Sequence, residues 1–196
     1  MGDDFAPARF LGLAGGDVTD ASLVHVRALT SLERLILLGT DVTDRGLVHL
    51  SGLTNLRELD LMGSRVTDDG LVHLGGLTSL EKLNLFDTEV TDAGLVHLKG
   101  LTSLRWLDLD GTRLSGDGLQ HLRALDNLEH LGLSKTQISD ADLMHLKRLT
   151  KLRSLSLSDS RVSEAAVKEL CAELPNLTVR LVGPSRFKTL GGDTPP

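Results

Sequence analysis

Apolar residues recur along this chain with a period of 24 residues. In each period two leucines stand two positions apart, which places both on one side of a short strand. Farther along, leucines take a helical spacing, as at Leu47 and Leu50. The first leucine of each strand pair stands at Leu11, Leu35, Leu59, Leu83, Leu107, Leu131 and Leu155. The pattern predicts seven stacked strand–turn–helix units, because neither half of a unit can bury its apolar side alone.

Polar residues mark the boundaries within each unit. A Thr–Asp pair such as Thr43 and Asp44 predicts a helix start, since the hydroxyl caps free N–H groups and the carboxylate suits the first turn. A glycine such as Gly46 follows, and we expect it to permit close packing. A hydroxyl residue at each strand-to-turn bend, such as Thr40, is expected to hydrogen-bond the backbone of the neighbouring unit.

The repeat predicts one elongated domain over residues 8–183. Residues 1–7 form an N-terminal edge segment, and the first strand has no obvious cap before it, so either these residues cover it or a preceding domain is missing. Near the C-terminus, LPNLTVRLVG predicts a last irregular strand that closes the stack. Residues 184–196 are rich in proline and glycine and are expected to be disordered.

The unit resembles the leucine-rich repeat, whose pattern is L-x-x-L-x-L-x-x-N/C-x-L. Leu56 to Val66 is one full copy, with Ser64 at the Asn/Cys position. With the V-T-D-x-G-L that follows, the unit is similar to bacterial repeats related to the cysteine-containing class of F-box/LRR proteins. The resemblance implies a right-handed α/β solenoid of about seven repeats and a C-terminal cap, with a concave parallel sheet and short convex helices. No F-box stands before the repeats in this sequence, so a ubiquitin-ligase role is not implied.

The composition limits the class of partner and the cellular compartment that we expect. The net charge of −6 without a polybasic run disfavours nucleic acid as a partner. One cysteine, Cys171, excludes a disulfide within the chain and favours a reducing compartment. No apolar run suits a signal peptide or reaches the ~20 residues of a membrane span. We therefore expect a cytoplasmic monomer without a cofactor, a metal or a membrane partner.

A column of histidines keeps the same period, at His25, His49, His73, His97, His121 and His145. A metal would need imidazole nitrogens within ~2.1 Å of one ion. Stacked helices lie roughly 8–10 Å apart, so consecutive members of the column cannot converge. We interpret these residues as half-buried histidines that hydrogen-bond a turn of the adjacent unit.

Strand residues that point away from the leucine core follow no structural rule and indicate where a partner binds. Leu38, Met62 and Phe86 are expected to be neighbours on the concave face, with Ile36 at one end and Trp106 diagonally at the other. Charged residues would rim these apolar side chains. The predicted partner-binding residues are Ile36, Leu38, Asp60, Met62, Lys82, Phe86, Trp106, Asp108 and Asp110. The simpler alternative is that these are ordinary surface apolar residues, or that the C-terminal tail folds over them.

Two other functions stay open at this point. Asp108, His130 and Ser154 stand on successive strands and suggest a weak hydrolase. The face is open, however, no oxyanion hole is evident, and the diagonal from Asp108 to His130 is long. A purely structural array without a partner is the other alternative. We expect a protein–protein interaction module that binds a partner protein or peptide and is not an enzyme.

Overall fold

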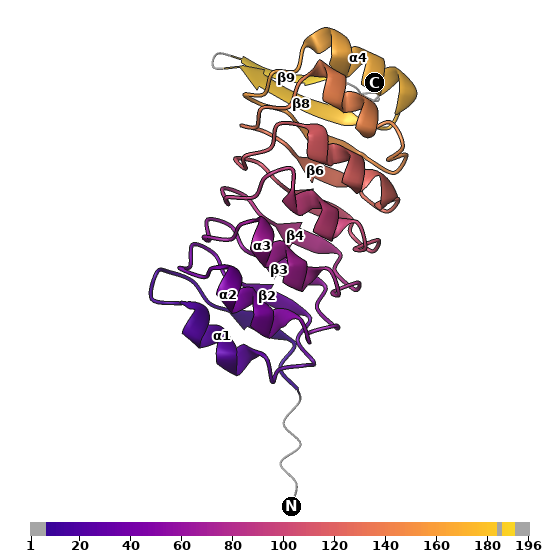
Figure 1. Cartoon of the computed structure of the whole chain (residues 1–196). Helices are drawn as coiled ribbons and strands as arrows, with labels where there is room; N and C mark the ends of the chain where they lie inside the picture. The colour runs from indigo at the N-terminus through magenta and orange to yellow at the C-terminus, as the bar shows by residue number, and fades with distance from the viewer. Residues whose placement is uncertain (1–6, 184–185, 191–196) are drawn as a thin grey trace, which may run out of the picture.

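The computed structural model describes residues 7–183 and 186–190. It is a single sheet with its strands in sequence order, and the first eight strands are parallel (Figure 1). This confirms the predicted solenoid and the seven repeat strands. The strands are β1 (Phe10–Gly12), β2 (Arg34–Ile36), β3 (Glu58–Asp60), β4 (Lys82–Asn84), β5 (Trp106–Asp108), β6 (His130–Gly132), β7 (Ser154–Ser156), β8 (Thr178–Gly183) and β9 (Arg186–Leu190).

Register follows the period of the repeat. Leu35 pairs with Leu59, Leu59 with Leu83, and Leu83 with Leu107. Each strand therefore meets the same position of the next repeat, and equivalent side chains stack in rows across the sheet. These rows decide which surface residues become neighbours.

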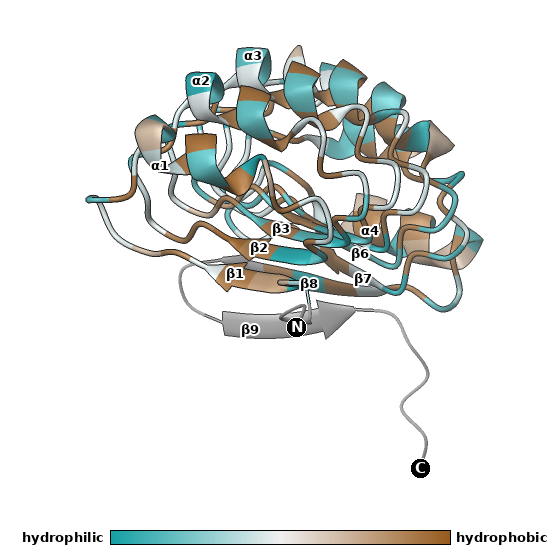
Figure 2. Cartoon of the chain, turned by 90° about the horizontal axis from the view of Figure 1, so that it is seen from below, coloured by the Kyte–Doolittle hydropathy of each residue, from teal (hydrophilic) through white to brown (hydrophobic). Residues whose placement is uncertain are grey.

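The helices form a second layer on one side of the sheet, as the view along the stack shows (Figure 2). Many are 3₁₀ turns, which suit helices of only a few residues. The helices are α1 (Asp20–Val26), α2 (Asp44–Leu47), η1 (Val48–Leu50), α3 (Asp68–Leu71), η2 (Val72–Leu74), η3 (Gly94–Leu98), η4 (Asp117–Ala124), η5 (Asp140–His145) and α4 (Glu164–Glu173). None of the helices in the described ranges is long and apolar enough to cross a bilayer.

The core lies between these two layers. The strand leucines and the helix leucines of the inner repeats, such as Leu59, Leu61, Leu71 and Leu74, are almost completely buried. Their burial is the main stabilising contribution, at about 2 kcal/mol for each leucine side chain.

The hydroxyl residue at each bend is structural, but its partner differs from the prediction. Thr40 Oγ1 donates to the carbonyl of Leu37 at 2.9 Å, and Thr88 Oγ1 to that of Leu85 at 2.7 Å. The acceptor lies three residues earlier in the same repeat, not in the neighbouring one. A short side chain reaches the carbonyl of its own turn most directly, and the bond satisfies a buried polar group.

The aspartate of each Thr–Asp pair links consecutive repeats. Asp44 Oδ1 accepts from the Thr67 amide and Oδ2 from the Thr67 hydroxyl, each at 2.8 Å. A Cβ atom added at Gly70 would lie too close to Asp44 Oδ1, so the glycine leaves room for this carboxylate. The predicted close packing at Gly70 is confirmed, and its cause is the carboxylate of the preceding repeat.

One repeat breaks this arrangement. Gly116 stands where five other repeats have the linking aspartate, and Asp142 stands where four other repeats have the glycine. Asp142 Oδ2 accepts from the Ser139 amide at 2.8 Å and from the Ser139 hydroxyl at 2.7 Å. The carboxylate therefore comes from the following repeat and occupies the space above Gly116.

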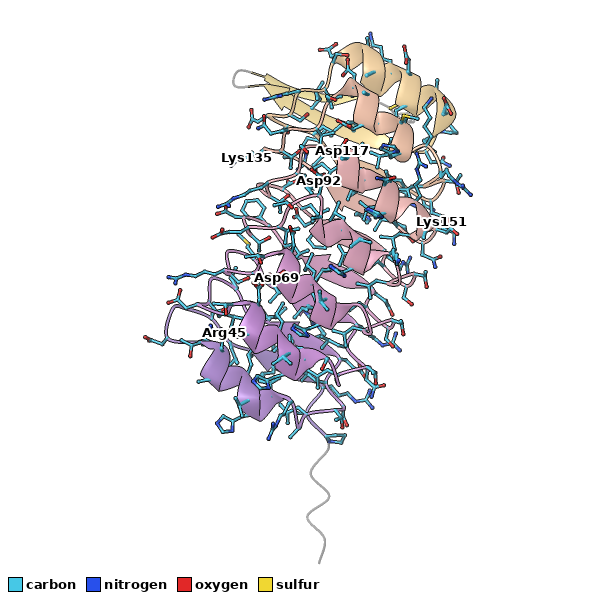
Figure 3. The ribbon with its side chains drawn as sticks, in the orientation of Figure 1. Arg45, Asp69, Asp92, Asp117, Lys135 and Lys151 are labelled. Atoms are coloured by element: carbon cyan, nitrogen blue, oxygen red, sulfur yellow. The ribbon has the colours of Figure 1, made fainter. Side chains whose placement is uncertain are left out.

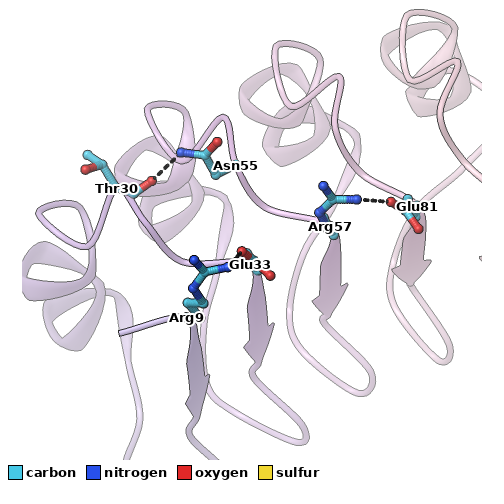
Figure 4. Close-up of polar contacts among 6 residues, drawn as sticks. All are labelled: Arg9, Thr30, Glu33, Asn55, Arg57 and Glu81. Atoms are coloured by element: carbon cyan, nitrogen blue, oxygen red, sulfur yellow. Dashed lines mark hydrogen bonds and ion pairs between the residues drawn. The ribbon is translucent and has the colours of Figure 1, made fainter. Parts of the chain in front are cut away.

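Ion pairs join the loops that precede the strands. Figure 4 shows Arg9 with Glu33 and Arg57 with Glu81, each at 2.5 Å between Nη1 and Oε1. The same column alternates arginine and glutamate through Arg9, Glu33, Arg57, Glu81, Arg105, Glu129 and Arg153. The arginine side chains are largely exposed and the glutamate side chains half-buried, so each pair lies at the surface and contributes at most about 1 kcal/mol.

The C-terminal end differs in part from the prediction. β8 is the expected closing strand, but β9 pairs antiparallel with it, from Val179 with Leu190 to Gly183 with Arg186. Residues 186–190 therefore form a strand where disorder was predicted, because the exposed edge of β8 offers unpaired backbone groups. Residues 184–185 and 191–196 lie outside the described part, as do residues 1–6 of the predicted edge segment.

Candidate functional site

The predicted binding residues lie on the sheet face, by which we mean the face of the sheet turned away from the helices. Asp60, Asn84 and Asp108 are consecutive in one row of the register. Gly132, Ser156 and Arg180 continue that row. The adjacent row runs from Lys82 through Trp106 to His130.

Leu38, Met62 and Phe86 are neighbours, as predicted from the period. Gly39 N donates to Met62 O at 2.8 Å, and Gly63 N donates to Phe86 O at 2.9 Å, which links the ends of β2, β3 and β4. Leu38 is 43% exposed, whereas Met62, Phe86 and Ile36 are half-buried. We call Ile36, Leu38, Met62 and Phe86 the apolar strip.

Asp110 occupies the position next to Phe86 in the following repeat, at the end of the apolar strip. Asp87 N donates to the Asp110 carbonyl at 2.9 Å, in the same pattern that joins Leu38 to Met62 and Met62 to Phe86. The strip and the acidic residues of the prediction therefore form one continuous surface. β9 lies beyond β8 at the far edge of the sheet, so residues 186–190 do not cover it.

Trp106 separates two hollows on this face. One has a volume of 160 Å³ and is lined by Glu58, Leu59, Asp60, Lys82, Asn84 and Trp106. The other has a volume of 240 Å³, and we call it the acidic hollow. It is lined by Trp106, Asp108, Asp110, His130, Leu131, Gly132, Ser154, Ser156 and Arg180.

Two carboxylates converge in the acidic hollow above Gly132. A Cβ atom on Gly132 would come within hard contact of both Asp108 Oδ1 and Asp110 Oδ1, at 2.4 and 2.7 Å. Asp108 Oδ1 accepts from the Asp110 amide at 2.9 Å, and Asp110 Oδ1 accepts from the Ser134 amide at 2.6 Å. The missing side chain of Gly132 therefore creates the space in which the two groups meet.

The acidic hollow raises the pKa of both carboxyls. Burial raises the pKa of Asp108 to about 6; the hydrogen bond from Asp110 opposes this, and the negative charges of Asp110 and Asp60 add to it. Burial also raises the pKa of Asp110, against hydrogen bonds from Ser134 and the positive charges of Arg180 and Lys135. Ionising these two carboxyls in the folded protein therefore costs more free energy than ionising an exposed pair.

Replacing Asp108 by asparagine is expected to stabilise the fold in neutral and alkaline solution. The folded-state pKa of about 6 exceeds the ordinary aspartate value of 3.8, so Asp108 costs stability as pH rises through this interval. Asparagine keeps the acceptor for the Asp110 amide and removes the charge. Because Asp108 is partly exposed, we expect a gain of about 1 kcal/mol at pH 8 that vanishes near pH 4.

Urea unfolding at both pH values measures this effect. The matched control is Asp126→Asn, an exposed aspartate whose replacement should change the free energy of unfolding by less than about 0.5 kcal/mol. A loss of stability in Asp108→Asn at pH 8 would contradict the prediction.

The structure does not bring Asp108, His130 and Ser154 into the contacts that a hydrolase would need. His130 pairs in register with Trp106 and Ser154, whereas the neighbour of Asp108 is Gly132. Among the described residues, no hydrogen bond joins Asp108 to His130 or His130 to Ser154. The three residues share the rim of the acidic hollow without the contacts that activate a serine.

The histidine column lies on the helical side, away from the sheet face. His25 is exposed and the other five members are half-buried. Within the described chain only His145 of this column has a side-chain hydrogen bond, between its Nδ1 and the Arg123 guanidinium. Half-burial of these five is confirmed, but the predicted hydrogen bonds to turns of the adjacent repeat are not found among the described residues. No group of three His, Cys, Asp or Glu side chains suited to a metal occurs in the described ranges.

Several residues of the face are not among the predicted binding residues. Asn84 and Gly132 belong to the register row of Asp108, and Arg180 comes from the irregular last strand. At the position after the strip, four repeats have glycine with positive φ, and Asp87, Lys135 and Asp159 adopt the same conformation with φ of 54°, 56° and 57°. The period itself was the signal that could have found Asn84 and Gly132, because they lie 24 residues before and after Asp108.

A second apolar surface lies on the helical side. Val24, Val48 and Val72 occupy equivalent positions in consecutive repeats and are 37–53% exposed. Met144 takes the same position farther along and is 57% exposed. These residues provide exposed apolar controls away from the sheet face.

Comparison with known proteins agrees with this architecture. The leucine-rich repeat family model matches residues 54–114. Among solved structures, the chain is similar to internalin C2 of Listeria monocytogenes, with 26% identity and a TM-score of 0.69 over 89% of this chain and 80% of that one. No curated protein matches the sequence.

A second structure, the internalin inlF of the same organism, has a TM-score of 0.60 over 80% of this chain. The chain spans about half of inlF (49%), and at 23% identity this likeness shows the fold alone. The narrower assignment to the cysteine-containing class stays a prediction. Residues 54–114 carry the leucine-rich repeat pattern, and the chain has the fold of a leucine-rich repeat solenoid.

Proposed function

We propose that this protein recognises a partner protein or peptide through its sheet face, the predicted concave side. The leucine-rich repeat match and the internalin-like fold support a protein–protein interaction module. The observation that carries the proposal is the apolar strip, where Leu38, Met62 and Phe86 adjoin on a solvent-facing surface. The repeat does not require apolar residues there, since the equivalent positions farther along are Asp110, Ser134 and Ser158.

The arrangement around the strip resembles a binding hot spot. Apolar and aromatic side chains lie at the centre, and charged groups stand beside them. Trp106 is half-buried between two hollows, so part of its ring remains free for contact. Asp60, Lys82, Asp108 and Asp110 supply the polar rim.

Alanine at both Phe86 and Trp106 is expected to abolish partner capture without unfolding the protein. Each truncation at a hot spot costs about 2 kcal/mol or more of binding free energy, so together they weaken binding roughly a thousandfold. The measurement is affinity capture from extract of the native cell, quantified by mass spectrometry, with thermal unfolding recorded for each variant.

Met144→Ala is the matched control, because it removes an exposed apolar side chain from the helical side. It should capture the same proteins as the wild type. If the double variant retains those proteins at the wild-type level, recognition does not use the sheet face and the proposal fails.

The function proposed here involves no chemistry of its own. Proteins with leucine-rich repeats of this fold are typically interaction modules, and no contact found among Asp108, His130 and Ser154 favours hydrolysis. A bacterial source, a cytoplasmic location and a monomeric state stay predictions from the sequence.

A further inference from the structure

The chemistry of the partner can be inferred from the surface that continues the apolar strip. Phe86 is followed across the sheet by Asp110, and the Asp110 carboxylate lies beside that of Asp108 above Gly132. Trp106 lines the same hollow. An aromatic ring and two carboxylates therefore adjoin the end of an apolar strip, in a depression of 240 Å³.

Seven ion pairs elsewhere on the described chain join charged side chains of neighbouring repeats. Glu58, for example, pairs with Arg34 at 2.7 Å, and Glu129 with Arg105 at 2.6 Å. Asp108 and Asp110 form no ion pair within 4.0 Å in the described part. The charged groups that act on Asp108 are the carboxylates of Asp60 on β3 and Asp110 after β5, and both are negative.

Among the described residues, the positive charges that act on the two carboxylates of the acidic hollow act on Asp110. Arg180 on β8 lines the opposite wall, and with Lys135 it acts on Asp110. The side towards Trp106 and Asp108 is left with negative charge that the described residues do not compensate. A half-buried charge of this kind is costly unless an opposite charge meets it, and a bound partner can supply that charge.

We propose that the acidic hollow receives an arginine or lysine side chain from an extended segment of the partner, next to apolar residues of that segment that cover the apolar strip. This inference rests on the proposed function and specifies its partner. The cationic group lies against the Trp106 ring and pairs with Asp108, while the apolar neighbours contact Phe86 and Met62. Cation–π contact and a desolvated ion pair both favour such a side chain.

Charge complementarity distinguishes this occupant from others. A diffusible metal ion would need at least one more ligand, and no suitable group of three exists in the described ranges. Arg180 on the far wall repels a free polycation that would spread over the hollow. A single cationic side chain that approaches from the apolar strip lies nearer to the carboxylates of Asp108 and Asp110 than to Arg180.

Selection of peptides on the full chain tests the inference. The probe is a phage-displayed library of random linear peptides, and the enriched peptides are then measured by fluorescence anisotropy. We expect enriched sequences with arginine or lysine next to leucine, isoleucine or phenylalanine. Their affinity should fall at least tenfold for Asp108→Asn combined with Asp110→Asn, because both negative charges of the acidic hollow are removed.

Asparagine preserves the acceptors for the Asp110 and Ser134 amides, so the variant should fold, and thermal unfolding verifies this. Asp126→Asn is the control and should bind like the wild type. The inference is overturned if no peptide is enriched, if the enriched peptides lack a basic residue, or if the double asparagine variant binds them normally.

The two proposals can fail separately. Peptides that depend on Phe86 and Trp106 but not on Asp108 and Asp110 would leave sheet-face recognition intact and refute the cationic side chain. Peptides that bind the Phe86→Ala, Trp106→Ala double variant as well as the wild type would refute both.

Discussion

Replacing Gly118 by alanine is expected to lower the free energy of unfolding by about 3 kcal/mol. The new Cβ atom would lie 2.7 Å from both Cα and the carbonyl oxygen of Asp92, which are backbone atoms of the preceding repeat. Because a backbone cannot rotate away as a side chain can, consecutive repeats must separate. The higher helix propensity of alanine, about 1 kcal/mol, only partly offsets this cost.

The displacement would also disturb a network around Asp92, which is labelled in Figure 3. Its carboxylate accepts from the amides of Ser115, Gly116 and Gly118 at 2.9 to 3.1 Å. Burial raises the pKa of Asp92, but the hydrogen bonds from Ser115, Gly118 and Gly116 outweigh it and leave the pKa below its ordinary value. The network therefore stabilises the fold above the ordinary pKa and is lost as pH falls.

Urea unfolding of Gly118→Ala and Gly76→Ala provides the comparison. A Cβ atom on Gly76 would meet nothing within 4 Å, and its backbone needs no positive φ. The control should therefore stay within about 0.5 kcal/mol of the wild type. Equal stability of the two variants would show that the repeats are not packed as tightly as the structure places them.

Exchanging the residues at positions 116 and 142 is expected to show strong coupling. Asp142→Gly removes the carboxylate that binds the Ser139 amide and hydroxyl, at a cost of about 2 kcal/mol. Gly116→Asp adds a side chain into the space that the Asp142 carboxylate fills, at a φ of 124° that disfavours any residue but glycine, and should cost at least about 2 kcal/mol.

In the double variant we expect residue 116 to adopt the helical backbone of the equivalent Asp44 and Asp68, which removes the strain of the positive φ. Its aspartate would then serve the next Thr or Ser, as in the other repeats. We expect the stability of the double variant to lie within about 1 kcal/mol of the wild type, with a coupling energy of about 3 kcal/mol. A double-mutant cycle in urea measures this coupling. If the two losses of stability are additive, the coupling energy is zero, and the aspartate at position 142 does not substitute for one at position 116.

The candidate site could be predicted in part. The period alone placed Leu38, Met62 and Phe86 side by side, because parallel strands in register align equivalent residues. Counting periods could not show that Gly132 leaves the space in which Asp108 and Asp110 meet. Arg180 was also missed, since it belongs to a strand outside the regular repeat.

By itself the sequence determined the architecture. A pattern of leucines repeated in every unit allows only one way to bury the apolar side of each strand and helix, and that way is a stack. Only the tertiary structure decided the details between repeats: that each aspartate serves the next repeat, that Asp142 replaces the carboxylate absent at Gly116, and that β9 adds to β8. These depend on distances between atoms of different repeats, which the pattern of one chain does not contain.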